Sequence, residues 1–135
     1  MESRMSRREL REHIFKLLFR IEFNSLQDMP EQEKLYFEDS CEAGAEDETY
    51  ISAKYQKIVD KLAQIDEEID KKAENWDTTR MGKVDLTILR LAVYEILFDE
   101  EIPTGVAINE AVELAKKFGQ DASSSFVNGI LAKFT

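Results

Sequence analysis

The segment DLTILRLAVYEILF, residues 85–98, is the strongest candidate for the core of the fold. Its apolar residues recur at spacings of three and four, which places five of them on one helical face: Leu89, Ala92, Val93, Ile96 and Leu97. Ile88 and Leu91 widen this stripe, so the segment is predicted to be a central helix. Asp85 is predicted to cap its amino terminus.

Helical spacing of apolar residues continues through most of the chain, which contains only two prolines and five glycines. This pattern predicts an all-α fold of about seven helices. The first helix is predicted to begin after Ser6, which forms a capping box with Glu9, and to end near Asn24. A short second helix is expected to open after Met29 and Pro30, because proline is tolerated in a first helical turn.

Residues 48–75 carry a seam of apolar side chains spaced by fours and threes. Two consecutive helices are predicted here, with a break near Gln64 and with Asp66 as the cap of the second. No linker or internal repeat divides the chain. We therefore expect a single domain, with an N-terminal helical half over residues 1–75 and a C-terminal helical half over residues 76–135.

Two further helices are predicted in the C-terminal half. The first follows Pro103 and ends at Gly119, a residue type that favours a left-handed helix cap. The last helix follows almost at once, with Ser123 or Asp121 as its cap. Trp76, like most aromatic residues, is expected in the core.

Charge is distributed unevenly along the chain, whose 18 basic and 28 acidic residues give a net charge of −10. Residues 1–20 hold six basic and three acidic residues, a local +3, whereas residues 21–53 hold ten acids and one lysine, a local −9. The overall sign argues against binding nucleic acid, but the basic end reopens that possibility. The acidic stretch EDSCEAGAEDE at 38–48 is typical of a solvated loop or of a surface for a basic partner.

Cys41 and His13 are the only residues of their kinds, and they restrict the chemistry of the chain. A single cysteine excludes an internal disulfide, and its acidic surroundings raise the pKa of the thiol, against a nucleophilic role. An isolated histidine is more simply structural or solvated than a metal ligand. The chain also has no phosphate-cradling glycine loop, no Gly-X-Ser-X-Gly motif and no histidine-based triad. We therefore expect neither enzymatic activity nor a cofactor or metal.

The apolar runs and the amino terminus also bear on where the protein acts. No run approaches the length of a membrane span, and the amino terminus MESRMSRREL has no apolar signal core. We expect a cytoplasmic protein that makes no membrane contact.

Four arginines form the sharpest local feature of the sequence. Their spacing of i, i+3, i+4 and i+7 predicts one face of a helix: Arg4, Arg7, Arg8 and Arg11. Guanidinium groups stay charged and donate several hydrogen bonds in a fixed fork, which suits phosphates. The alternative, an exposed helix end with weak ion pairs, is equally consistent with the spacing.

Longer motifs resemble the NusB transcription antitermination family. They are WDTTRMGKVDLTILRLAVYEIL (76–97), IPTGVAINEAVELAKKFG (102–119) and FVNGILAKF (126–134), together with the arginine-rich SRRELREHIFKLLF (6–19). The resemblance implies an all-α fold of two small helical bundles packed together. It also implies an RNA-binding factor that is not an enzyme.

The family's partners are implied by the same resemblance. NusB proteins pair with the ribosomal protein NusE, bind the single-stranded boxA element of ribosomal RNA leaders and act on the transcription elongation complex to suppress premature termination. Both monomers and homodimers occur in the family, so the oligomeric state stays open. A helical adaptor that binds proteins without contacting RNA is the alternative.

The family's RNA-binding positions fall on Arg7, Arg8 and Arg11, with Arg4 as an extension, and on a second group near the last helix. That second group comprises Phe118, Phe126 and Asn128. Family members often carry a basic residue directly before this phenylalanine, where this chain has three serines. Charge complementarity places the surface for the basic NusE partner at Glu95, Asp99 and Glu100.

Overall fold

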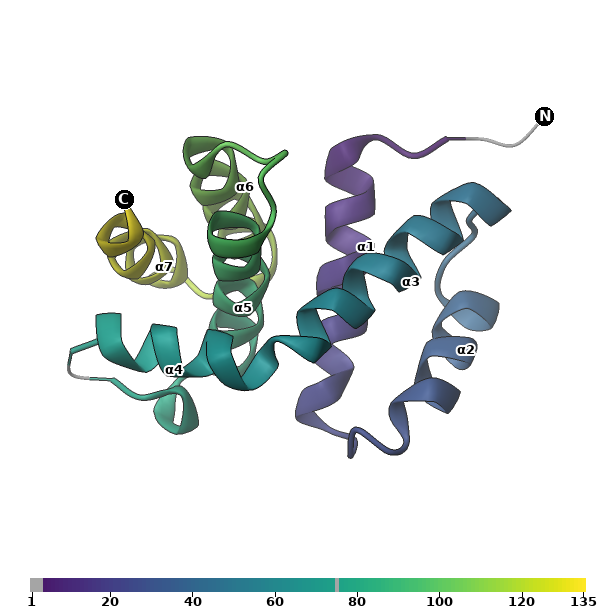
Figure 1. The fold of residues 1–135 in the computed structure, drawn as a ribbon, viewed down its shortest axis with the longest axis horizontal. Coiled ribbons are helices and arrows are strands. Elements are labelled where there is room, and N and C mark those ends of the chain that lie inside the picture. The colour runs from purple at the N-terminus through teal and green to yellow at the C-terminus, as the bar shows by residue number, and fades with distance from the viewer. Residues whose placement is uncertain (1–3, 75) are drawn as a thin grey trace. The chain divides into compact units, whose positions relative to one another are not determined.

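The computed structural model describes residues 4–74 and 76–135, and within them it contains seven α-helices and no strand (Figure 1). The predicted all-α fold and helix number are confirmed. The chain divides into two compact units, Met1–Val59 and Asp60–Thr135. In the described part of the chain, no helix combines the length and apolar character needed to cross a membrane. The α-helices are α1 (Arg7–Phe19), α2 (Met29–Asp39), α3 (Ala45–Asp60), α4 (Leu62–Lys72), α5 (Lys83–Phe98), α6 (Thr104–Phe118) and α7 (Ser123–Leu131).

The start of α1 confirms the predicted capping box. The Ser6 hydroxyl accepts a hydrogen bond from the backbone N–H of Glu9 at 3.1 Å, and the Glu9 carboxylate accepts one from the backbone N–H of Ser6 at 3.2 Å. The α-helix ends at Phe19, earlier than the predicted end near Asn24. A 3-10 turn (Arg20–Glu22) follows it directly. Its core residues are Ile14, Leu17 and Leu18, each at most 2% exposed.

The other two helices of the first unit also follow the sequence pattern. Pro30 lies in the first turn of α2, as predicted. The apolar seam predicted from residue 48 onward supplies the buried face of α3 through Ile51, Tyr55 and Ile58. The acidic stretch is mostly helical, because only residues 40–44 lie between α2 and α3. Its last acids occupy the first turn of α3, where negative charge is favourable at the positive end of the helix dipole.

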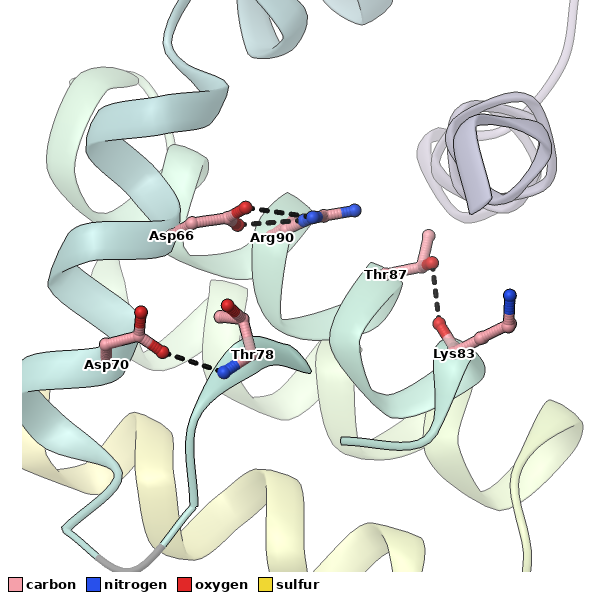
Figure 2. A network of polar contacts seen from close by, with 6 residues as sticks. All are labelled: Asp66, Asp70, Thr78, Lys83, Thr87 and Arg90. Atoms are coloured by element: carbon pink, nitrogen blue, oxygen red, sulfur yellow. Dashed lines mark hydrogen bonds and ion pairs between the residues drawn. The ribbon is translucent and has the colours of Figure 1, made fainter. Parts of the chain in front are cut away.

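The break between α3 and α4 falls at Lys61, not near Gln64, and no side chain caps α4. The prediction that Asp66 caps this helix is therefore wrong. Asp66 lies inside α4, where its two carboxylate oxygens accept hydrogen bonds from Nε and Nη2 of Arg90 at 2.8 and 2.9 Å (Figure 2). A bidentate pair of this kind fixes both side chains in one geometry.

Helix α5 is the centre of the second unit, as predicted, and it packs against α4, α6 and α7 (Figure 1). Ile88, Leu89 and Val93 on this helix are fully buried. Asp85 does not cap α5, because the helix begins two residues earlier, at Lys83, with Gly82 before it. Asp85 instead adds a favourable negative charge to the first turn.

The unit boundary at Val59 and Asp60 differs from the predicted division between residues 75 and 76. The difference arises because α4 is tied to the C-terminal helices. Besides the Asp66–Arg90 pair, the Asp70 carboxylate accepts a hydrogen bond from the backbone N–H of Thr78 at 2.7 Å (Figure 2). Arg90 lies 24 residues from Asp66 in sequence and Thr78 follows the end of α4, so the apolar spacing of the helix does not reveal either contact.

The ends of α6 and α7 correct two further predictions. Gly119 ends α6 in an extended conformation, with φ −92° and ψ −169°, and is not a left-handed cap. Neither Asp121 nor Ser123 caps α7. Ser123 is the first residue of the helix, and its hydroxyl accepts a hydrogen bond from the backbone N–H of Gln120 at 2.9 Å.

Candidate nucleic-acid interface

The arginine-rich amino terminus lies in the first unit. Arg7 and Arg8 are exposed and occupy the first two positions of α1, directly after the Ser6 cap. Arg4 is also exposed, but it precedes the helix, and its guanidinium lies 3.0 Å from a carboxylate oxygen of Glu46. The four arginines therefore do not share one helical face, because Arg4 lies outside the helix. We call Arg4, Arg7 and Arg8 the arginine segment.

Arg11 differs from the arginine segment because it is only 7% exposed. Charged side chains are buried where polar partners compensate them, so a substitution here is expected to affect folding as well as any ligand. Arg7 and Arg8, in contrast, place two positive charges at the positive end of a helix, which is locally unfavourable by a few tenths of a kcal/mol or more. An anion bound at this helix end relieves that repulsion and is favoured by the positive end of the helix dipole.

The predicted RNA-binding residues of the second unit lie at the end of α6 and on α7. Phe118 is half-buried, and the ammonium of Lys117 lies 5.5 Å from the centre of its ring. Phe126 is also half-buried, whereas Asn128 is exposed. The two α7 residues are two positions apart, so they point to different sides of the helix.

Two surface hollows flank α7, and each contains one of these predicted residues. Asn128 belongs to what we call the amide groove, a depression of about 550 Å³ between α6 and α7. The amide groove is lined by Gly105, Ile108, Asn109, Val112, Ser124, Ser125 and Asn128. Phe126 belongs to what we call the aromatic hollow, of about 300 Å³. The aromatic hollow is lined by Ala73, Glu74, Trp76, Ser125, Phe126, Gly129, Ile130 and Lys133.

Trp76 also lies in this region, and its exposure was not predicted. The sequence places it in the core, but it is 49% exposed, so that prediction is wrong. Its ring packs edge-to-face on Phe126, with centroids 6.0 Å apart and planes at 84°. The guanidinium of Arg80 lies 6.0 Å from the centre of the Trp76 ring. The polar sequence around it, ENWDTTR, was the available signal for an exposed position.

The residues predicted for the protein partner have different exposures. Glu95 is only 1% exposed, within the buried part of α5. Asp99 is partly exposed, and its carboxylate accepts a hydrogen bond from the backbone N–H of Glu101 at 3.2 Å. Glu100 and Glu101 are exposed. The accessible negative charge therefore lies just after α5, in the loop before α6.

His13 and Cys41 both lie in the first unit, in surroundings that suppress reactivity. Nδ1 of His13 is 2.6 Å from the hydroxyl of Tyr36, and burial lowers the pKa of the imidazole. Cys41 is 5% exposed, and burial, assisted by the charge of Glu48, raises the pKa of its thiol. This direction confirms the predicted shift for Cys41, although burial is its main cause. Both groups are neutral at neutral pH, as structural residues usually are.

The lowered pKa of His13 predicts a loss of stability in mild acid. The unfolded chain, in which the imidazole has its ordinary pKa of 6.5, takes up the proton first as the pH falls. The free energy of unfolding therefore decreases as the pH drops below that value. We expect the melting temperature to fall more between about pH 8 and about pH 5 for the natural chain than for His13→Gln. Glutamine retains a hydrogen-bonding group for Tyr36, so equal pH dependence in both proteins would contradict the prediction.

Comparisons with known proteins agree over nearly the full chain. The sequence profile of the NusB family matches residues 8–135. The chain is 51% identical over 130 residues to the transcription antitermination protein NusB of Agathobacter rectalis, covering 96% of this chain and 99% of that protein. It is 47% identical to the NusB protein of Natranaerobius thermophilus, covering 94% and 92% of the two chains.

Solved structures show the same fold. T. maritima NusB superposes with a TM-score of 0.85 at 36% identity, covering 98% of this chain and 92% of that one. A chain from a crystal structure of the antitermination factors NusB and NusE in complex with double-stranded RNA superposes with a TM-score of 0.83 at 26% identity, covering 95% and 94%. With sequence profile, close relatives and fold in agreement, the chain belongs to the NusB family.

Proposed function

We propose that this chain is a transcription antitermination factor that binds the single-stranded boxA element of ribosomal RNA leaders together with the ribosomal protein NusE. In the transcription elongation complex, this binding suppresses premature termination. Family membership supports the proposal, and the complex of the similar NusB and NusE proteins with double-stranded RNA supports a role in RNA binding beside NusE. The observation that carries it is the exposed pair Arg7 and Arg8 at the start of α1.

The arginine segment supplies the phosphate contacts in this proposal. Each guanidinium donates hydrogen bonds in a planar fork that matches two phosphate oxygens. Arg7 and Arg8 are held by a capped helix, so their backbone does not have to be ordered when RNA binds. Arg4 has to exchange its ion pair with Glu46 for a phosphate, and both of these side chains are largely exposed. Such an exposed pair is weak, so the exchange costs little.

The second unit supplies contacts to bases. Asn128 presents an amide in the amide groove, where Asn109 presents another. Amides donate and accept hydrogen bonds and therefore suit the edges of unpaired bases. Phe118 and Phe126 offer aromatic faces that stack on bases regardless of sequence.

NusE is proposed to bind next to the acidic residues Asp99 and Glu100. A basic ribosomal protein complements their charge, which steers association more than it adds affinity. Glu95, being buried, contributes to such a contact only through the position of α5. The net charge of −10 repels RNA at long range, so the NusE partner is expected to supply much of the RNA affinity.

A titration of labelled single-stranded boxA RNA, with and without NusE, tests the proposal. We expect saturable binding that NusE strengthens, and weaker binding of a scrambled strand and of a duplex of equal length. The three phosphate contacts of the arginine segment should contribute about −2 to the slope of log affinity against log salt, and any further phosphate contact makes the slope steeper. Binding of NusE without any RNA binding, alone or in the complex, would instead identify a protein adaptor.

A further inference from the structure

We propose that the aromatic hollow is a stacking site for one unpaired RNA base, in which Trp76 and Phe126 hold the base and Arg80 and Lys133 face its phosphates. This inference rests on the proposed function and deepens it. It adds Trp76, Arg80 and Lys133 to the residues that contact RNA, and it specifies a single-stranded ligand at this position.

The indole of Trp76 is presented to solvent in a fixed orientation. The backbone N–H of Trp76 donates a hydrogen bond to the carbonyl of Ala73 at 2.8 Å, which closes the turn after α4. Two residues later, the N–H of Thr78 is held by the Asp70 carboxylate (Figure 2). The edge-to-face contact with Phe126 then holds the ring itself. A large aromatic surface that is half exposed yet anchored is prepared for a flat apolar ligand.

The chemistry around the hollow favours a nucleotide over an apolar peptide. Trp76, Phe126 and Ile130 line the hollow with apolar side chains, and Lys133 adds a positive charge to the lining. The ammonium of Lys133 donates a hydrogen bond to the carbonyl of Lys72 at 2.9 Å, which keeps this charge close to the hollow. With Arg80 beside the indole, two cations flank one aromatic pair. Stacking rings with neighbouring cations are typical of single-stranded nucleic-acid sites.

Two carboxylates lie near the same hollow and limit its positive charge. Glu74 lies 3.6 Å from the ammonium of Lys133, but its side chain is 76% exposed, so this pair is easily exchanged for a phosphate. Asp77 accepts hydrogen bonds from the backbone N–H of Arg80 and from the Thr79 hydroxyl. Its charge is thus engaged in holding the turn. Arg80 and Lys133 also supply positive charge near Phe126, where this chain has Ser125 in place of the family's frequent basic residue.

The single tryptophan of the chain makes the site directly measurable. We expect single-stranded boxA RNA to quench the indole emission, with a midpoint equal to that of the anisotropy titration. A duplex of the same sequence should quench it far less, because paired bases are not free to stack. The variant Trp76→Ala should bind the single strand roughly tenfold more weakly, the loss of one stacked base. Trp76→Phe should restore most of that loss.

A matched control is Phe23→Ala in the first unit. Phe23 is 61% exposed and packs edge-to-face on Phe19, as Trp76 does on Phe126, but it does not line the aromatic hollow. This variant should leave RNA affinity unchanged. Circular dichroism of each variant verifies that helicity is retained.

The outcomes separate this inference from the proposed function. If the natural chain binds boxA RNA while its indole emission and the affinity of Trp76→Ala stay unchanged, the stacking site is refuted and the proposed function stands. If Trp76→Ala weakens binding of NusE but not of RNA, the hollow is a protein-docking site and the inference is equally refuted. If no RNA binds to the natural chain, with or without NusE, the proposed function itself is refuted.

Discussion

Replacing Arg7 and Arg8 together by alanine is expected to weaken binding of boxA RNA about a hundredfold, because each charge-assisted hydrogen bond to a phosphate contributes roughly 1.5 kcal/mol. The fold should be unaffected. Both side chains are exposed, alanine is the best helix former, and removing two positive charges from a helix amino terminus is slightly stabilising. RNA affinity measured by anisotropy should therefore fall, while the melting temperature stays the same or rises slightly.

Two further measurements sharpen this result. The salt slope should become less steep by about 1.4, since the two phosphate contacts of Arg7 and Arg8 are lost. The paired substitution Lys34→Ala and Lys57→Ala removes the same charge from exposed positions elsewhere in the first unit, and it should leave affinity nearly unchanged. Unchanged RNA binding in the arginine variant would mean that these residues only solvate a helix end. Arg11→Ala is a less direct test, because its burial couples RNA binding to folding.

Local rules account for the parts of the fold that the sequence predicts well. The Ser6–Glu9 capping box spans three residues, and the buried stripe of α5 repeats within a single helix. Interactions of this kind depend only on residues close in sequence. The predicted break near Gln64 relied on Asp66 as a helix cap, and it was wrong because Asp66 instead pairs with Arg90, 24 residues away; the break lies at Lys61. A side chain that fits a helix cap by type is thus used in a tertiary contact instead.

Prediction of the candidate site from sequence fails for the same reason, because the exposure of its residues depends on contacts outside their own helix. The spacing of the arginines predicts a common face, but the helix starts at Arg7 and tertiary packing buries Arg11. Trp76 was assigned to the core by residue type, whereas its exposure depends on a turn held by Asp70 and Thr78. The resemblance to a family indicates which residues matter, but their accessibility follows only from the three-dimensional packing.

Substituting Gly119 by alanine is expected to destabilise the second unit by about 3 kcal/mol, the upper end for overpacking, and to lower the melting temperature by roughly 10 °C. A Cβ at this position would lie 2.5 Å from Cβ and Oγ of Ser123 and 2.8 Å from the carbonyl oxygen of Ala115. The Ser123 Cβ cannot rotate away, because it moves only with the backbone of α7. The glycine is therefore required for space at the α6–α7 junction, since its φ of −92° is open to any residue.

A second substitution tests this steric explanation. Ser123→Gly removes both side-chain atoms that the new Cβ would meet, so the double variant Gly119→Ala, Ser123→Gly should be less destabilised than the sum of its single variants. Recovery should be partial, because the Ala115 carbonyl still lies 2.8 Å from the added carbon. Gly129→Ala is the matched control: nothing lies within 4 Å of its Cβ position inside α7, so it should gain up to about 1 kcal/mol of helix propensity. Chemical denaturation of the natural chain, the single variants Gly119→Ala and Ser123→Gly, and the double variant gives the coupling energy between the two positions. Additive effects of Gly119→Ala and Ser123→Gly would show that the close approach at this junction does not determine the stability of the unit.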